Sequence, residues 1–457
     1  MSVRTSAGIG RRCPVHSSSP FSSESLPSES LPSGSLPPEP LPSKPPSPDY
    51  DFRAPDDWSD FTEVVGLAYG GYDHSPEHRA AVAELLEPKR SLLACAAGRP
   101  CATLAGYSLD MTLPGTGPRP VFGIGYVAVS PAHRRRGLMR DMILRVLTDL
   151  HTTQAEPVAV LNSTEPALYG RFGFGAASQA VALTIPLEAR ELTEGPADDG
   201  PPLTLEVTSP AEAAAAIAAV CRACLAERPG MLRREGAWLR RALADPPADR
   251  GGAGRLLCML ATDGAGPRGY ALYRLTAGWT HSCPRYTVSV QELSACDPAA
   301  YAFLWRALLD VDLSGTVTAG ARPVDDPVLA LLADPRSAAP TVRDQLYARA
   351  VDVDRALSGR GYAAEAEVVL EVTDPLCPWN EGRWRLITGT TGADCVRTRA
   401  HADLALTARE LGAVLLGGSS LVQLARAGRV AELRPGAVRA AAAAFRHDPA
   451  PYCPVVF

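Results

Sequence analysis

The chain lacks an apolar run long enough to cross a membrane, since no hydrophobic stretch approaches the ~18 residues that a span needs. It also lacks the apolar segment of a signal peptide, because Ser and Pro follow Arg11 and Arg12. We therefore expect a cytoplasmic protein. Lysine is scarce as well, with only Lys44 and Lys89 in 457 residues. This bias is typical of a GC-rich genome, and no function follows from it.

A basic surplus is absent too, because the formal net charge is -5. That balance argues against a nucleic-acid partner and is compatible with a small cationic substrate. The histidines, among them His74, His78 and His401, lack a partner at metal-ligand spacing, so we predict no metal site.

The eleven cysteines are odd in number and scattered, and several stand inside apolar runs. This pattern favours buried, reduced thiols over a disulfide framework. Cys221 and Cys224 form a CxxC with no second pair at zinc spacing nearby. We expect both to pack inside a helical segment.

The length suggests about three domains, at a prior of about 150 residues each. Residues 1–48 are rich in Ser and Pro and are expected to form a disordered tail. A first globular unit is expected over 49–195, up to the turn-rich linker GPADDGPP. A second unit over 196–344 and a third over 345–457 complete the predicted organisation.

The first unit reads as a mixture of helices and strands. Strands are predicted in 91–98, 100–113, 123–130 and 158–164, and the main helix in 138–151. Apolar residues recur three and four apart along one face of that helix. The second unit echoes the order of strands and helix.

The junction VAVSPAHRRRGLMR, residues 127–140, carries the most chemical information. A strand leads through a loop into a helix, whose N-terminal N–H groups and dipole favour an anion. Gly137 allows close backbone approach, and Arg134, Arg135 and Arg136 supply neutralising charge. These residues fit a phosphate site, although a solvated basic helix start would show the same residues. The second unit has only ACDPAA at 295–300, which indicates a degenerate copy without the loop.

The loop, the helix after it, the next strand and the stretch LYGRFGFG together resemble the GNAT N-acetyltransferases, in which such a loop binds the pyrophosphate of acetyl-CoA. The usual GNAT pattern has Gly or Ala two residues after the glycine, where this chain has Met139. Backbone contacts do not depend on that side chain.

The closer resemblance, over residues 50–457, is to the Eis (enhanced intracellular survival) family, whose loop is similar almost residue for residue, with a large residue at the position of Met139. It implies a mixed α/β (α+β) fold: two tandem GNAT-like mixed-sheet domains, the second degenerate, and a C-terminal sterol-carrier-like domain. It also implies acetyl-CoA as co-substrate, acetyl transfer to amines such as aminoglycosides, and a homohexamer.

The resemblance assigns roles position by position. Tyr169 is implied as general acid and the carboxylate of Phe457 as general base. The coenzyme contacts it implies are Val127, Ala128, Val129, Arg134, Arg135, Arg136, Gly137, Leu138, Met139, Arg140, Thr164 and Glu165.

The chemistry of acetyl transfer suits these two groups. A tyrosine of pKa near ~10 can protonate a departing thiolate of pKa about 8.5. A chain-terminal carboxylate, with a reference pKa of about 3.5, is a weak base in water. It would need either burial by the apolar end PVVF or a bridging water. From the residues alone, Tyr169 is equally a packing aromatic and Phe457 a frayed terminus. His133, beside the arginines, is read as a solvated cap.

Two further functions stay open. A non-catalytic protein could bind acyl-CoA or a lipid through the C-terminal domain. Alternatively, the acetyl acceptor could be a protein lysine or a small polyamine.

Overall fold

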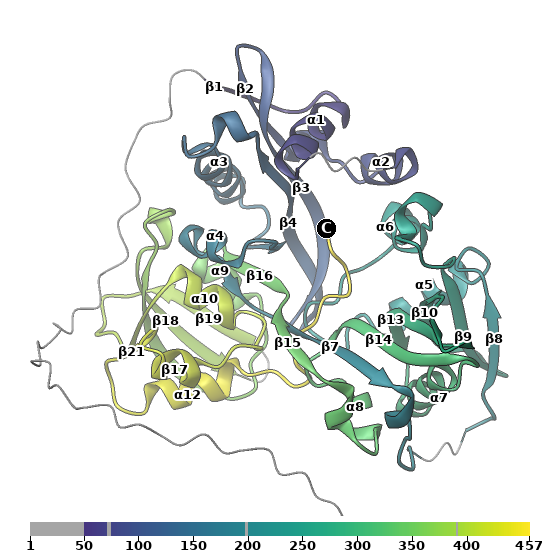
Figure 1. Ribbon diagram of the computed structural model, residues 1–457. Helices are drawn as coiled ribbons and strands as arrows, with labels where there is room; N and C mark the ends of the chain where they lie inside the picture. The colour runs from purple at the N-terminus through teal and green to yellow at the C-terminus, as the bar shows by residue number, and fades with distance from the viewer. Residues whose placement is uncertain (1–49, 71–74, 197–199, 390–391) are drawn as a thin grey trace, which may run out of the picture. The chain divides into compact units, whose positions relative to one another are not determined.

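The computed structural model describes residues 50–70, 75–196, 200–389 and 392–457. The tail expected over 1–48 lies outside the described residues, as does His74. The described chain folds into three mixed sheets with helices packed on them (Figure 1). Mixed α/β architecture is therefore confirmed.

The first sheet holds the long strands predicted around the arginine-glycine junction. Its strands in spatial order are β1 (Tyr50–Arg53), β2 (Leu92–Ala96), β3 (Arg99–Leu113), β4 (Gly117–Val129), β5 (Val158–Asn162), β16 (Leu346–Ala350) and β6 (Gly175–Ala176). All neighbours pair antiparallel except β4 and β5, which run parallel.

Helices cover both faces of this sheet. They are α1 (Ser59–Ala68), α2 (Pro76–Ala83), α3 (Leu138–Thr152) and the short α4 (Pro166–Tyr169). The six apolar residues predicted for one face of α3 are all buried: Leu138, Met142, Ile143, Val146, Leu147 and Leu150. They pack on Phe122 and Ile124 on one face of the sheet. Phe61 of α1 packs with residues whose side chains point to the other face, such as Leu93.

The second sheet is built on the same plan. Its strands in order are β15 (Thr341–Asp344), β7 (Gln179–Pro186), β14 (Ser314–Pro323), β13 (Tyr286–Ala295), β10 (Gly266–Thr276), β9 (Leu257–Asp263) and β8 (Thr204–Thr208). Its helices are α5 (Ala214–Ala223), α6 (Gly236–Leu243), α7 (Pro298–Leu309) and α8 (Val328–Leu331), and β11 (Trp279–Thr280) pairs with β12 (Cys283–Pro284). As in the first sheet, one pair is parallel, β13 with β14.

The third sheet has five strands. Their order is β19 (Gly392–Arg397), β18 (Gly382–Gly389), β17 (Ala366–Thr373), β20 (Leu404–Thr407) and β21 (Ala431–Glu432). The helices are α9 (Val353–Ser358), α10 (Ala408–Val414), α11 (Leu421–Arg426) and α12 (Ala437–Phe445).

Two strands join sheets across the positions where the sequence suggests domain boundaries. β16 follows residue 345 but lies between β5 and β6 of the first sheet. β7 precedes residue 195 but lies between β15 and β14 of the second. Strand pairing therefore links the three units, which a linear division of the sequence does not reveal.

The described cysteines are all free thiols. Cys95 and Cys258 are buried in the core, and so are Cys221 on α5 and Cys224 directly after it. The prediction of reduced, packed thiols is confirmed for these four residues. Within the described ranges, no three His, Cys, Asp or Glu side chains come together as a possible metal site. None of the helices described is both long and apolar enough to cross a bilayer.

Candidate active site

The first sheet opens between β4 and β5. These strands pair only from Phe122–Ile124 to Ala159–Leu161, while β4 continues to Val129 along β3. Tyr126 has a left-handed backbone, φ 46°, where the register with β3 slips. A bulge of this kind bends a strand. The β4–β5 pairing ends just before this bulge, and the place where the two strands part is called the slot below.

The three β4 residues predicted to contact the coenzyme lie on the part of β4 that has left β5. Ala128 is buried, while Val127 and Val129 are half-buried. The Tyr69 hydroxyl donates to the Val127 carbonyl at 3.4 Å. This backbone therefore borders the slot, where a thioester arm could bind alongside the strand.

The loop after β4 forms an anion-binding geometry. Gly137 is the N-cap residue of α3, with φ 90° and no side-chain cap on the helix. The first N–H groups of α3 are thus not capped by the N-cap side chain. Arg134, Arg135 and Arg136 are all exposed around this helix start. An α-helix N-terminus flanked by guanidinium groups suits a pyrophosphate.

Two of the arginines are also tied to the rest of the unit. Arg134 donates to the Ala68 carbonyl at 2.9 Å, which fixes the loop to α1. Arg136 donates to the Tyr50 hydroxyl at 3.2 Å, and that hydroxyl is 3.0 Å from His133 Nδ1. His133 thus has a partner on β1, in keeping with a structural role.

The remaining predicted coenzyme residues fall around the same helix start. Leu138 is buried in the core and Met139 is half-buried against it. Arg140 Nη1 lies 3.7 Å from Asp141 Oδ1. Thr164 and Glu165 are exposed between β5 and α4. Any contact from Leu138 must therefore come from its backbone.

Tyr169 ends α4 and is only 9% exposed. Its ring makes an edge contact with Phe174 at 6.2 Å, and no described residue hydrogen-bonds to its hydroxyl. Burial, reinforced by Tyr69 and Glu165, raises the pKa of this phenol. The hydroxyl is therefore a proton donor at neutral pH, with no partner among the described residues competing for it.

The chain terminus is folded into the first sheet rather than frayed. Phe457 is 7% exposed, and its backbone N–H donates to Asn162 Oδ1, at the end of β5, at 3.4 Å. Its ring makes edge contacts with Tyr107 and Trp238. Figure 1 marks this terminus beside β4.

Two glycines of β4 make room for the terminus. A Cβ on Gly125 would lie 3.0 Å from the terminal carboxyl carbon and 3.1 Å from the carbonyl oxygen of Phe457. A Cβ on Gly123 would lie 3.3 Å from its ring. The terminal carboxyl group therefore sits directly on β4, one residue beyond the point where β4 and β5 part.

A series of hydrogen bonds holds the last eight residues, the C-terminal segment 450–457, in an extended course. The Tyr452 N–H donates to the Pro229 carbonyl at 2.9 Å, and Gln345 Nε2 donates to the Cys453 carbonyl at 2.6 Å. Arg241 Nη1 donates to the Val456 carbonyl at 2.7 Å. This segment is therefore tied down, whereas most chain ends are poorly ordered.

The structure brings most predicted residues around one slot. The β4 backbone, the arginine loop, Tyr169 and Phe457 all border the end of β4 or β5. Tyr169 ends α4, which follows β5 in the chain, and Phe457 lies against Gly125.

The sequence did not identify Gly123, Gly125, Asn162 or Arg241. The alternation GIG inside a buried strand is a signal for close backbone approach at the two glycines. Nothing in the sequence marks Asn162 or Arg241, because their partners lie 295 and 215 residues away.

Comparison with known proteins agrees with this architecture. Acetyltransferase (GNAT) domain models match residues 50–177 and 230–350, and a sterol carrier protein domain model matches residues 353–454. The predicted fold, two GNAT units followed by a sterol-carrier-like domain, is confirmed. GNAT domains use acetyl-CoA as co-substrate.

Whole-chain relatives give the family. An uncharacterized N-acetyltransferase of Streptomyces avermitilis is 41% identical over 87% of this chain and 97% of its own length. N-acetyltransferase Eis of Mycobacterium tuberculosis is 32% identical over 86% of this chain and 95% of its own. The crystal structure of Eis1 from Mycobacterium abscessus superposes with a TM-score of 0.75 at 31% identity, covering 89% of this chain and all of that one. The chain therefore belongs to the Eis family of GNAT N-acetyltransferases.

Proposed function

We propose that this N-acetyltransferase transfers the acetyl group of acetyl-CoA directly to a primary amine of a polycationic substrate, such as an aminoglycoside, in a ternary complex. The observation that carries the proposal is the terminal carboxyl group of Phe457, held on Gly125 at the slot between β4 and β5. A terminus without a catalytic role does not require a strand glycine and a series of hydrogen bonds to place it.

The arginine loop would hold the coenzyme. The residues present fit its pyrophosphate, because uncapped helix N–H groups, a left-handed glycine and exposed guanidinium groups converge at the start of α3. Val127, Ala128 and Val129 would align the pantetheine arm along β4. Thr164 and Glu165, at the end of β5, would flank it on the other side.

Phe457 and Tyr169 would move the protons. The carboxylate of Phe457 accepts a proton from the attacking amine, directly or through a water, as the nitrogen bonds to the thioester carbonyl carbon. When the carbon–sulfur bond breaks, the sulfur takes the electron pair and Tyr169 supplies its proton. The raised pKa of Tyr169 keeps this donor protonated before the step.

The substrate class follows from charge. A carboxylate at the reaction centre attracts an ammonium group and orients it before deprotonation. Trp58, directly before α1, and Tyr126 of β4 lie with ring centroids 4.9 Å apart, and aromatic faces favour cations. A homohexamer remains a prediction from the family resemblance, and measuring the native mass tests it.

Two modified termini test the proposal. Thiol release from acetyl-CoA is followed with aminoglycosides, polyamines and lysine peptides for the native chain and for a chain extended by Gly-Ser after Phe457. A third protein, ligated to end in a Phe457 carboxamide, keeps the shape of the terminus and removes its charge. Acetyl-CoA affinity is measured for all three proteins as the control.

The proposal expects turnover in the native chain only, with acetyl-CoA affinity unchanged. Equal turnover in all three would remove Phe457 from the mechanism. An active carboxamide beside an inactive extended chain would limit Phe457 to positioning. The acceptor turned over with the highest kcat/KM identifies the substrate class.

A further inference from the structure

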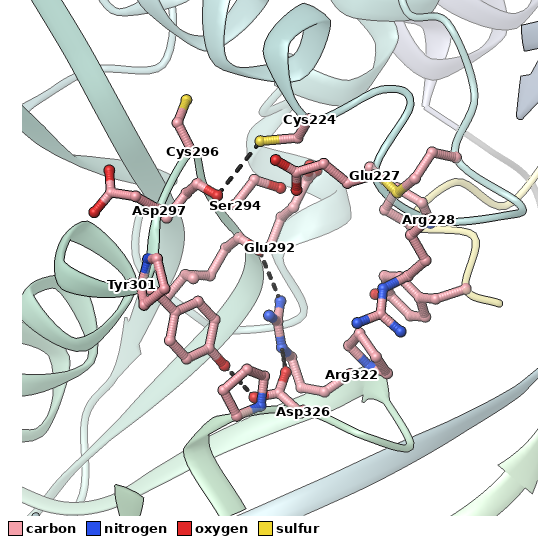
Figure 2. A pocket seen from close by; sticks show the side chains of 18 of the residues that line it. Cys224, Glu227, Arg228, Glu292, Ser294, Cys296, Asp297, Tyr301, Arg322 and Asp326 are labelled. Carbon is pink, nitrogen blue, oxygen red and sulfur yellow. Dashed lines mark hydrogen bonds and ion pairs between the residues drawn. The ribbon is translucent and has the colours of Figure 1, made fainter. Parts of the chain in front are cut away.

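The second GNAT unit contains a slot of the same origin as the active site. β13 and β14 pair in parallel only as far as Val290 and Ala319. Gln291 is an extra residue in β13, because Val290 and Glu292 pair with consecutive residues of β10. β13 and β14 therefore repeat the bulge and the parting that β4 and β5 show in the first sheet. A cavity of about 510 Å³ lies beyond the parting (Figure 2).

This cavity has lost the features that bind a nucleotide. Asp297 occupies the N-cap of α7, where its Oδ1 accepts the Ala300 N–H at 2.9 Å. Pro298, the first residue of α7, has no N–H to offer. A carboxylate in the place of a phosphate repels anions, so this slot does not suit a second coenzyme A.

The walls are mostly apolar and come from several parts of the chain. Met231 follows α5, Leu331 ends α8, and Tyr452 and Pro454 belong to the C-terminal segment. The volume falls within the range of about 300–1,000 Å³ typical of sites for drug-sized ligands. The space is therefore suited to an apolar body.

Most of the charged groups in the walls are already paired. Arg322 Nε is 2.7 Å from Asp326 Oδ2, and Arg322 also donates to the Leu293 carbonyl at 3.0 Å. Arg228 pairs with Asp325 at 2.5 Å. In Figure 2, Tyr301 and Asp326 lie on one side of the cavity and Cys224 and Glu227 on the other.

Glu227 differs from these groups. It lines the cavity from an exposed position, and within the described part of the chain its carboxylate has no hydrogen bond or ion pair. Burial raises the pKa of this carboxyl group and the Arg228 guanidinium offsets part of that rise. One negative charge is thus available to a ligand, beside an apolar space.

We propose that this cavity is a second ligand site, separate from the acetylation site, which binds a small molecule with an apolar body and one protonated amine. The body lies between α8 and the C-terminal segment, and the ammonium group contacts Glu227. Anionic and neutral molecules of the same shape lack this partner and bind more weakly.

Cys296 provides a readout that does not depend on turnover. It lines the cavity and is half-buried, while Cys283 is the exposed cysteine of the described chain. The full chain carrying Cys283→Ser is treated with iodoacetamide, in a buffer without amines and without acetyl-CoA. The pH is about 8.5, near the reference pKa of a thiol. Mass spectrometry of the Cys296 peptide gives the alkylation rate.

Three probes share one body: 4-phenylbutylamine, 4-phenylbutanol and 4-phenylbutanoate. The amine is expected to halve the alkylation rate at a concentration about fivefold below that of the alcohol, the ratio that one partly exposed ion pair supports. The carboxylate protects least. Glu227→Gln removes the advantage of the amine, and Ala330→Trp, which fills the cavity from an exposed position of α8, abolishes protection.

Unchanged melting temperatures of both variants show that they fold. Equal protection by amine and alcohol, or an amine advantage that persists in Glu227→Gln, would overturn the proposal. Absence of protection by any probe would overturn it as well. An amine bound at the acetylation site does not cover Cys296, so the result is independent of the proposed catalysis.

Discussion

Substituting Gly125 with Ala is the sharpest test of the placement of the terminus. The new methyl carbon would lie 3.0 Å from the carboxyl carbon of Phe457 and 2.9 Å from Cε2 of Tyr107. Carbon atoms prefer about 3.5–4.0 Å, so the chain end must move by roughly 0.5–1 Å. A misplacement of about 1 Å at a reacting group costs on the order of 100-fold in rate. We expect kcat to fall by about 10- to 100-fold.

The effect on stability should be much smaller than the effect on rate. Overpacking costs about 1–3 kcal/mol, whereas replacing Gly by Ala in a strand recovers about 0.4–1 kcal/mol from the unfolded state. A chain end yields more easily than a core, so the net loss should be at most about 2 kcal/mol. Thermal unfolding measures it.

Gly320→Ala is the matched control. Gly320 also lies in a strand, β14, and a Cβ there would meet nothing within 4 Å. Thiol release at saturating acetyl-CoA and amine gives kcat, and titration gives the acetyl-CoA affinity. The expected result is a loss of kcat in Gly125→Ala alone, with coenzyme affinity unchanged in both. Wild-type turnover in Gly125→Ala would refute the argument that the terminal carboxylate acts from this position.

Three further changes have defined outcomes. Tyr169→Phe should lower kcat by about 10²–10⁴-fold with the fold intact. Because burial raises the pKa of the Tyr169 phenol, its deprotonation should not limit the wild-type rate below about pH 10. A pH–rate profile of both proteins checks these two expectations. Arg136→Ala should raise the KM for acetyl-CoA about tenfold at unchanged kcat, because it removes one charge-assisted contact. An equal fall in kcat would contradict a role of Arg136 in coenzyme binding alone. Glu292→Gln leaves buried Arg234 without its charged partner and should cost about 3–5 kcal/mol at pH 7 by denaturant unfolding. Burial raises the pKa of the Glu292 carboxyl group, but Arg234 and Tyr270 outweigh burial and lower that pKa. The ion pair therefore stabilises the native protein at pH values above the unfolded-state pKa of about 4.3. The difference in unfolding free energy between the wild type and Glu292→Gln should close as the pH falls below that value.

Local patterns in the sequence were sufficient for most elements of the first unit. The apolar spacing of 138–151 predicts α3 and all six of its core residues, because a helical period fixes which side chains share a face. The loop RRRG predicts an anion-binding helix start, because Gly137 and the arginines are consecutive in the chain. Such features depend on neighbours a few residues apart.

The sequence by itself determined the class of fold and the family, and it predicted the coenzyme loop. The tertiary structure decided what depends on distant pairing. It placed β16 and β7 in sheets across the predicted boundaries, and it put Phe457 on Gly125 and Arg241 on the last peptide. These contacts join segments up to 332 residues apart, and local propensity carries no information about such partners. Only the folded chain shows that its last carboxyl group lies where two strands of the first sheet part.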